Sequence, residues 1–470
     1  MRKIAGFCCV FALTFGALAS FAANQPKVLL HSTTKGSPIK AGSIKYFGPD
    51  HFNLNKLKAQ NHLSKAMNQK ILAMQKGATY RNCSGIITIP CFSSWLITGY
   101  RNSVYTYTMV GHSPTAGGTT TIPTHIIPLE TLLVGPDNTT ILYDFNPQAA
   151  NNNQPFSPLN DVQLLTQGPI FANDPYPGGG GLAADNGQFN DTGFRASFTG
   201  IKKANWHTLL GAPTFPSVNY AEVLFFNNGD WTCVFGSGPP CAAGDFPVVN
   251  INSISNIFAQ ILGPANENVS STEIPIIETD FVTAFDPSGG CCALGFHSSN
   301  QGNEGSNSIS VWTWGTFIPK ANNPFGPFGN DVMVLTHETS ELYHDPFVGE
   351  GGLIGVVLVS PWVDGSASFG QANLETGDAI EAMNASDVIF PLTQNTTGGS
   401  YTYSEQNVAI LPWFTRNPKG PQTGPGPGVY SWPNTNVLNN GHPCASQGFV
   451  YGEGPAGFFF DDGSSTGQCH

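Results

Sequence analysis

Five titratable side chains lie close together in the stretch Val334–Phe347, VLTHETSELYHDPF. They are two histidines, two glutamates and an aspartate, namely His337, Glu338, Glu341, His344 and Asp345. Only 11% of the chain is charged, less than half of the usual ~25%. Imidazole and carboxylate groups gathered in this way are ligands of divalent metal ions. The stretch therefore predicts a metal site, and a buried, metal-free network of hydrogen bonds is the alternative.

The residues around this stretch predict a helix. An aliphatic run precedes the polar residues, and a proline follows them, so a buried helix with a polar face is expected over Asn330–Asp345. On a helix, His337 and Glu341 are four residues apart and share one face. His344 continues that face two turns from His337, which makes it an alternative ligand.

The helix resembles the H-E-x-x-H helix of zinc peptidases, in which two ligands four residues apart hold the metal and the intervening glutamate activates a water molecule. The resemblance implies that His337 is a ligand, that Glu338 is the catalytic base, and that Glu341 replaces the second histidine. A carboxylate oxygen binds zinc at about 2.0–2.2 Å. H-E-x-x-E departs from the zinc peptidase signature, and oxygen ligands also suit harder ions, so calcium is the alternative to zinc.

A longer run is similar to a group of secreted H-E-x-x-E proteins. The group includes exordium-like plant extracellular proteins and many uncharacterised bacterial exported proteins. The similar elements are the H-E-x-x-E sequence itself, Asp345-Pro346, Trp362 and the segment Glu375–Glu381, ETGDAIE. This resemblance implies a shared metal-site-like core more than any particular reaction.

A third ligand is expected from the second group of acidic residues. Glu375 and Asp378 are three apart and would project together if a helix began near Leu374. We slightly favour Glu375 over Asp378 as the third ligand, and Glu381 is another candidate.

Three other histidines are interpreted as structural. His125 alternates with apolar neighbours on an expected strand, which is typical of a core histidine. His207 lies beside a tryptophan and His297 beside a cysteine pair, and we interpret both as packing or loop residues. The chain has no G-x-S-x-G sequence for a serine nucleophile.

The N-terminus predicts export. Residues 1–23 have a basic start, an apolar stretch and small residues, the layout of a secretory signal peptide. No later stretch approaches the ~20 apolar residues of a membrane span. The formal net charge of −12 argues against binding to nucleic acid. A secreted or extracellular protein is expected.

The cysteines predict disulfides. Eight remain after the signal peptide, an even number for an oxidising compartment. No C-x-x-C spacing supports a zinc cluster. Cys83–Cys91 and Cys233–Cys241 are expected to close local loops. The other four, Cys291, Cys292, Cys444 and Cys469, pair either as 291–292 and 444–469 or in crossed bridges.

The rest of the sequence predicts an α+β fold. We expect a single large, β-rich core with a few helices, including the buried H-E-x-x-E helix, and with disulfide bonds that stabilise it. Residues 24–85 are expected to form an extended leader and an amphipathic helix, and residues 86–470 the core. A helix, or a helix with a turn, is predicted over Phe194–Gly211, and a further helix over Val249–Gly263. The Asn/Pro/Gly-rich stretch Asn146–Asn190 is predicted to be a loop.

These observations favour a secreted, zinc-dependent hydrolase that acts on a peptide or protein substrate. The alternative is a non-catalytic extracellular or cell-surface binding protein with a structural metal or a metal-free polar core. Catalysis requires Glu338 to face a cleft connected to solvent. The substrate and the oligomeric state are not specified by the sequence.

Overall fold

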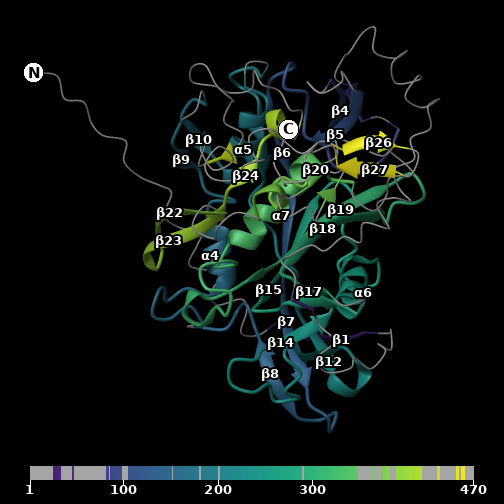
Figure 1. Cartoon of the computed structure of the whole chain (residues 1–470), viewed down its shortest axis with the longest axis vertical. Coiled ribbons are helices and arrows are strands. Elements are labelled where there is room, and N and C mark those ends of the chain that lie inside the picture. The colour runs from purple at the N-terminus through teal and green to yellow at the C-terminus, as the bar shows by residue number, and fades with distance from the viewer. Residues whose placement is uncertain are drawn as a thin grey trace, which may run out of the picture.

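The structure is a computed structural model, shown in Figure 1. It describes residues 25–32, 45–46, 81–83, 85–97, 104–150, 152–178, 182–199, 202–287, 290–347, 362–363, 370–371, 374–381, 388–414, 431–433, 451–454 and 457–460. The predicted signal peptide, the predicted amphipathic helix before residue 78 and the cysteines at 444 and 469 lie outside these residues. Among the described residues, no helix has both the length and the apolar character needed to cross a bilayer.

The centre of the molecule is a seven-stranded sheet in the order β1-β12-β7-β15-β19-β18, with β8 beside β7. Neighbouring strands from β1 to β19 are parallel, whereas β18 and β8 are antiparallel to their neighbours. The bounds are β1 Lys27–His31, β7 Thr124–Val134, β8 Ile141–Phe145, β12 Asn219–Phe225, β15 Ile274–Asp280, β18 Gly295–Gln301 and β19 Ile309–Phe317.

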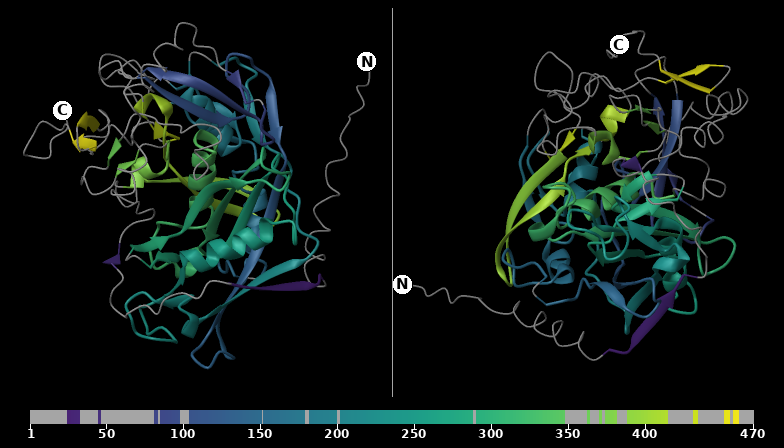
Figure 2. Two further views of the ribbon diagram at one scale, coloured as in Figure 1. Left: turned by 90° about the vertical axis from the view of Figure 1, so that its right-hand side faces the viewer. Right: turned by 60° about the horizontal axis from the view of Figure 1, so that its bottom comes forward.

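Two helices cover opposite faces of this sheet, α6 (Ile251–Leu262) and α7 (Met333–His344). Successive strand residues divide between two hydrophobic clusters: Ile276 packs in the cluster that includes α7, and Ile277 in the cluster that includes α6. Side chains alternate across a strand, so the two clusters lie on the two sides of the sheet. Figure 2 shows this layered arrangement.

Smaller sheets and helices surround the central layers. A five-stranded sheet has the order β13-β14-β16-β17-β2, a three-stranded sheet the order β3-β4-β5, and the remaining strands pair in twos. The strand bounds are β2 Lys45–Tyr46, β3 Arg81–Asn82, β4 Cys91–Ile97, β5 Val104–Val110, β6 Thr119–Ile122, β9 Asp174–Tyr176, β10 Asp185–Gly187, β11 His207–Leu210, β13 Trp231–Cys233, β14 Pro247–Asn250, β16 Ala284–Asp286, β17 Gly290–Ala293, β20 Trp362–Val363, β21 Gly370–Gln371, β22 Ile389–Thr396, β23 Gly399–Gln406, β24 Val408–Ala409, β25 Ser431–Trp432, β26 Tyr451–Gly454 and β27 Gly457–Phe460. The helix bounds are α4 Asp161–Gln167, α5 Phe189–Ser197, α8 Asp378–Glu381 and α10 Leu411–Phe414.

The predicted fold class, strand-rich α+β with a few helices, is confirmed, and so is the helix predicted over Val249–Gly263. One local prediction is wrong: the stretch 146–190 is not all loop, because Asn160 and Gln163 form a capping box that starts α4. A second is confirmed in part. The stretch Phe194–Gly211 contains the end of a helix and a turn, but α5 begins earlier, at Phe189, and residues 207–210 form β11.

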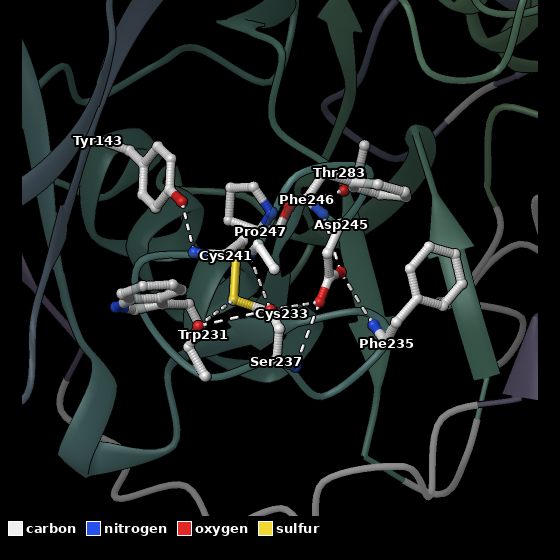
Figure 3. The surroundings of a disulfide bond; sticks show 12 residues. Tyr143, Trp231, Cys233, Phe235, Ser237, Cys241, Asp245, Phe246, Pro247 and Thr283 are labelled. Atoms are coloured by element: carbon white, nitrogen blue, oxygen red, sulfur yellow. Dashed lines mark hydrogen bonds between the residues drawn. A yellow bond between two sulfur atoms is a disulfide. The ribbon is translucent and has the colours of Figure 1, made fainter.

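The structure pairs three sets of cysteines: Cys83 with Cys91, Cys233 with Cys241, and Cys291 with Cys292. The two local loops therefore close as predicted, and the adjacent pair takes one of the two arrangements left open. Figure 3 shows the surroundings of the Cys233–Cys241 bridge, where the Tyr143 hydroxyl accepts a hydrogen bond from the Cys241 amide at 2.8 Å.

A buried glutamate in the central sheet makes the stability of the protein depend on pH. Burial raises the pKa of Glu222 on β12 to about 8, against the hydrogen bond donated by Thr131. Below about pH 4.5 the side chain is protonated in both the folded and the unfolded chain, so it contributes no pH dependence there. Between that pH and pH 8 only the unfolded chain ionises, and stability falls. Since each pKa unit corresponds to about 1.36 kcal/mol, the loss is on the order of 5 kcal/mol.

Glu222→Gln removes this loss and keeps an acceptor for the Thr131 hydroxyl. We expect the variant to match the wild type at pH 4 and to be more stable at pH 8, as measured by urea unfolding at both values. Asp286→Asn, at an exposed position, is the control and should show no such divergence. Equal stability of Glu222→Gln and wild type at pH 8 would contradict the prediction.

Candidate metal centre

Helix α7 positions the polar cluster, and all twelve of its residues are buried. It begins three residues after the predicted start and ends one residue before Asp345. It packs against β19 and β18, where Gly295 and Gly315 allow a close approach. A Cβ on Gly295 would lie 2.9 Å from Cγ of Glu338, and one on Gly315 would lie 2.7 Å from a methyl carbon of Leu335. A helix buried on every side must satisfy its polar side chains within the protein.

The first group of potential ligands consists of His337, Glu341 and Asp378. His337 Nε2 lies 3.1 Å from Glu341 Oε1 and 3.3 Å from Asp378 Oδ1. Two ligands of a tetrahedral zinc ion with bonds of about 2.0–2.1 Å are separated by about 3.3 Å. The donor types and these separations therefore fit a zinc ion.

Gln406, at the end of β23, fixes the orientation of the His337 ring. Its side-chain nitrogen donates to the Gly377 carbonyl at 3.0 Å, so its oxygen faces His337 Nδ1, also at 3.0 Å. Nδ1 therefore carries a proton and donates it, and Nε2 is the ring nitrogen that faces Glu341 and Asp378. A hydrogen bond of this kind holds metal-binding histidines in place in many proteins.

Glu341 is held by the backbone that precedes α8. Its Oε1 accepts hydrogen bonds from the amides of Gly377 at 2.8 Å and Asp378 at 3.2 Å. The same short segment thus supplies the Asp378 carboxylate and orients the Glu341 carboxylate.

The second group consists of His297, Glu338 and Glu341. His297 is on β18, and its Nδ1 lies 3.4 Å from Glu338 Oε2 and 3.7 Å from Glu341 Oε2. One ligand atom from each of the three residues lies within 4.8 Å of the others, as is also true of the first group. Glu341 belongs to both groups, with one oxygen directed to each.

Glu375 contacts the far side of the His297 ring. Its Oε2 lies 3.7 Å from His297 Nε2, and it belongs to neither group of ligand atoms. This contact is electrostatic, because His297 Nε2 makes no hydrogen bond with the described residues. The structure therefore places Asp378, not the slightly favoured Glu375, next to His337.

The pKa shifts at this centre share one cause, which is that carboxylates lie together away from water. Burial raises the pKa of Glu341 to about 7, against the opposing charge of His337. Burial and the charge of Glu341 raise the pKa of Glu375 well above its ordinary value. Burial also raises the pKa values of Asp378 and Asp345, the latter to about 6.

His297 shows the opposite balance. Burial lowers its pKa, but the charge of Glu375 and the hydrogen bond with Glu338 outweigh burial and raise the pKa to about 9. Without a metal ion, His297 is therefore protonated at neutral pH and partly balances the negative charge of the carboxylates. The centre is one that takes up cations, either protons or metal ions.

The alternative ligand His344 does not join the centre. Its Nδ1 donates to the Ser340 carbonyl at 2.7 Å, and its Nε2 lies 3.0 Å from the Ser197 hydroxyl. Burial lowers the pKa of His344 to about 4, so the ring is neutral and Nε2 accepts the hydroxyl proton. Both nitrogens are engaged away from the carboxylates.

The structure thus brings together His337, Glu341 and Asp378, and places Glu338 and Glu375 beside His297. The interpretation of His297 as a packing or loop residue is wrong. Nothing in its local sequence relates it to α7, because Glu338 lies 41 residues further along the chain. Only the position of His297 on the buried face of a strand could have suggested a role for it in a metal centre. His125 instead contacts Glu267 at 3.1 Å and Thr214 at 2.8 Å, away from the centre.

Comparison of the chain with family models, with curated proteins and with solved structures finds no match in any of the three. The resemblances to zinc peptidases and to secreted H-E-x-x-E proteins therefore rest on the residues quoted for them, and the centre is interpreted from its own geometry.

Proposed function

We propose that this chain is an exported, metal-dependent hydrolase that acts on a peptide bond, with a zinc ion held by His337, Glu341 and Asp378. The observation that carries the proposal is the convergence of three buried ligand atoms, with separations of 3.1 and 3.3 Å from His337 Nε2. The three disulfides suit an oxidising compartment outside the cytosol.

The residues around this ion have distinct roles in the proposed reaction. A zinc ion held by His337, Glu341 and Asp378 would polarise the carbonyl of the substrate and lower the pKa of a water molecule towards ~7. Glu338 would be the base that accepts a proton from the attacking water and passes it to the leaving amine. His297, 3.4 Å from Glu338 Oε2, positions this carboxylate. Gln406 holds the proton on Nδ1 of His337, so that Nε2 remains a ligand.

One observation favours the alternative, a non-catalytic extracellular or cell-surface protein with a structural metal or a metal-free polar core. The Glu338 side chain is only 3% exposed, so the described residues do not give it the cleft connected to solvent that catalysis requires. A general base must reach the proton that it accepts, and a substrate must reach the base. Metal binding and catalysis therefore need separate measurements.

The test combines elemental analysis with a cleavage assay on the purified full chain. We expect zinc in the wild type and a lower zinc content in His337→Ala. We expect Glu338→Gln to retain the ion held by His337 but to cleave a quenched-fluorescence peptide library about 10²–10⁴-fold more slowly, the usual contribution of a general base. Zinc binding without cleavage of any library peptide by the wild type would support the non-catalytic alternative.

The control is His344→Gln, which changes a histidine on the same helix that lies outside the centre. It should keep the zinc content of the wild type. Absence of zinc, calcium and other divalent ions from the wild type, also after each has been offered, would overturn the proposed function.

A further inference from the structure

The carboxylates of the centre outnumber the charges that one metal ion can balance. Five of them lie around His297 and His337: Glu338, Glu341, Asp345, Glu375 and Asp378. The described basic side chains within ion-pair distance of these carboxylates are the two histidines. With neutral histidines, the five carboxylates carry up to five negative charges, and each divalent ion bound here would balance two of them. Buried charges without a counter-charge are strongly unfavourable.

The geometry provides two places for cations, not one. The first lies between His337, Glu341 and Asp378, and the second between His297, Glu338 and Glu341. Glu341 Oε1 faces His337 at 3.1 Å, while Oε2 faces His297 at 3.7 Å. A carboxylate that directs one oxygen to each of two ions holds them in the arrangement of two-metal hydrolases, at a separation of about 3.5–4 Å.

Both histidines also have the surroundings of a ligand. In His337, Nδ1 contacts Gln406, and Nε2 faces the first of the two cation places. In His297, Nε2 lies near Glu375, and Nδ1 faces the second cation place. In each ring, one nitrogen faces the carboxylates of its group, and the other faces a polar side chain that can fix the ring. The two halves of the centre are thus built on the same plan, from different elements of the fold.

We propose that this centre binds two divalent metal ions, bridged by the Glu341 carboxylate, with His297 and Glu338 as ligands of the second ion. This inference rests on the proposed function, because it extends the same site. Glu338 Oε2, which faces His297, would bind the second ion, so that Oε1 is the oxygen that would act as the base of the proposed function. The second group has separations of 3.4 and 3.7 Å from His297 Nδ1, and its carboxylate oxygens suit Mn²⁺ as well as zinc.

The number of bound ions tests the inference. The full chain is stripped with a chelator and titrated with Zn²⁺ or Mn²⁺, and bound metal is counted by native mass spectrometry and elemental analysis. We expect two ions in the wild type, one in His297→Ala, one in His337→Ala and none in Glu341→Gln, which removes the bridge. His125→Ala, which removes a histidine that contacts a carboxylate elsewhere, should still bind two.

A measurement on the wild type avoids any dependence on the folding of the variants. Two Mn²⁺ ions bridged at about 4 Å should give a broad, exchange-coupled electron paramagnetic resonance spectrum, distinct from that of isolated Mn²⁺. One ion in the wild type, unchanged in His297→Ala, together with the spectrum of isolated Mn²⁺, would overturn the two-metal inference and leave the proposed function intact. No bound ion in the wild type would overturn both.

Discussion

Removal of metal from the purified protein is expected to lower its melting temperature by roughly 5–10 °C. A ligand that binds only the folded chain, at a concentration of 100–1,000 times its Kd, stabilises the fold by about 2.7–4.1 kcal/mol. A change of 1 kcal/mol corresponds to about 2–4 °C in a chain of 150–250 residues, and to less in a longer one. Here the loss is expected because chelation leaves Glu341 and Asp378 buried without their cation.

The measurement is differential scanning calorimetry before and after chelation, followed by re-addition of Zn²⁺. The wild type should recover its melting temperature when Zn²⁺ returns. His337→Ala should respond much less to both steps, because it lacks a ligand of the first ion. Elemental analysis shows whether the wild type has lost its metal. If it has, and its melting temperature is unchanged, the buried polar network is stable without a metal ion.

Much of the local structure around the centre could be predicted because it depends on short-range pattern. Four-residue spacing places His337 and Glu341 on one side of α7, where their side chains lie 3.1 Å apart. The acidic residues Glu375 and Asp378, which follow α7 in the chain, also lie at this centre, and Asp378 contacts His337. The α6 helix and the two local disulfides follow in the same way from periodicity and from cysteine spacing.

The rest depends on contacts between distant segments, which no local pattern encodes. His297 reaches Glu338 only because β18 pairs with β19 at the edge of the sheet on which α7 packs. Gln406 reaches His337 from β23, across 69 residues. Likewise, the parallel order of the central sheet joins strands that are far apart in the chain, so it could not be derived from strand periodicity.

Gly377→Ala is expected to disrupt the proposed zinc site, because Gly377 lies against the ring of His337. A Cβ at this position would lie 2.3 Å from Nδ1 and 2.6 Å from Cγ of His337. The ring would have to move, and its hydrogen bond to Gln406 would be lost. Overpacking of this kind costs about 1–3 kcal/mol, and the loss of bound metal adds to it. Loss of an orienting contact lowers metal affinity by about 10–100-fold.

The decisive measurement is a double-mutant cycle with His337→Ala, carried out by urea unfolding in the presence of a chelator. Without metal, the cycle reports only the steric conflict between the new methyl group and the imidazole ring. We expect Gly377→Ala to destabilise the wild-type background more than the His337→Ala background, by about 0.5–3 kcal/mol, the range for residues in contact. Additive effects would mean that the methyl group is accommodated without moving His337. In that case the close approach of Gly377 would not be what holds the ring against Glu341 and Asp378.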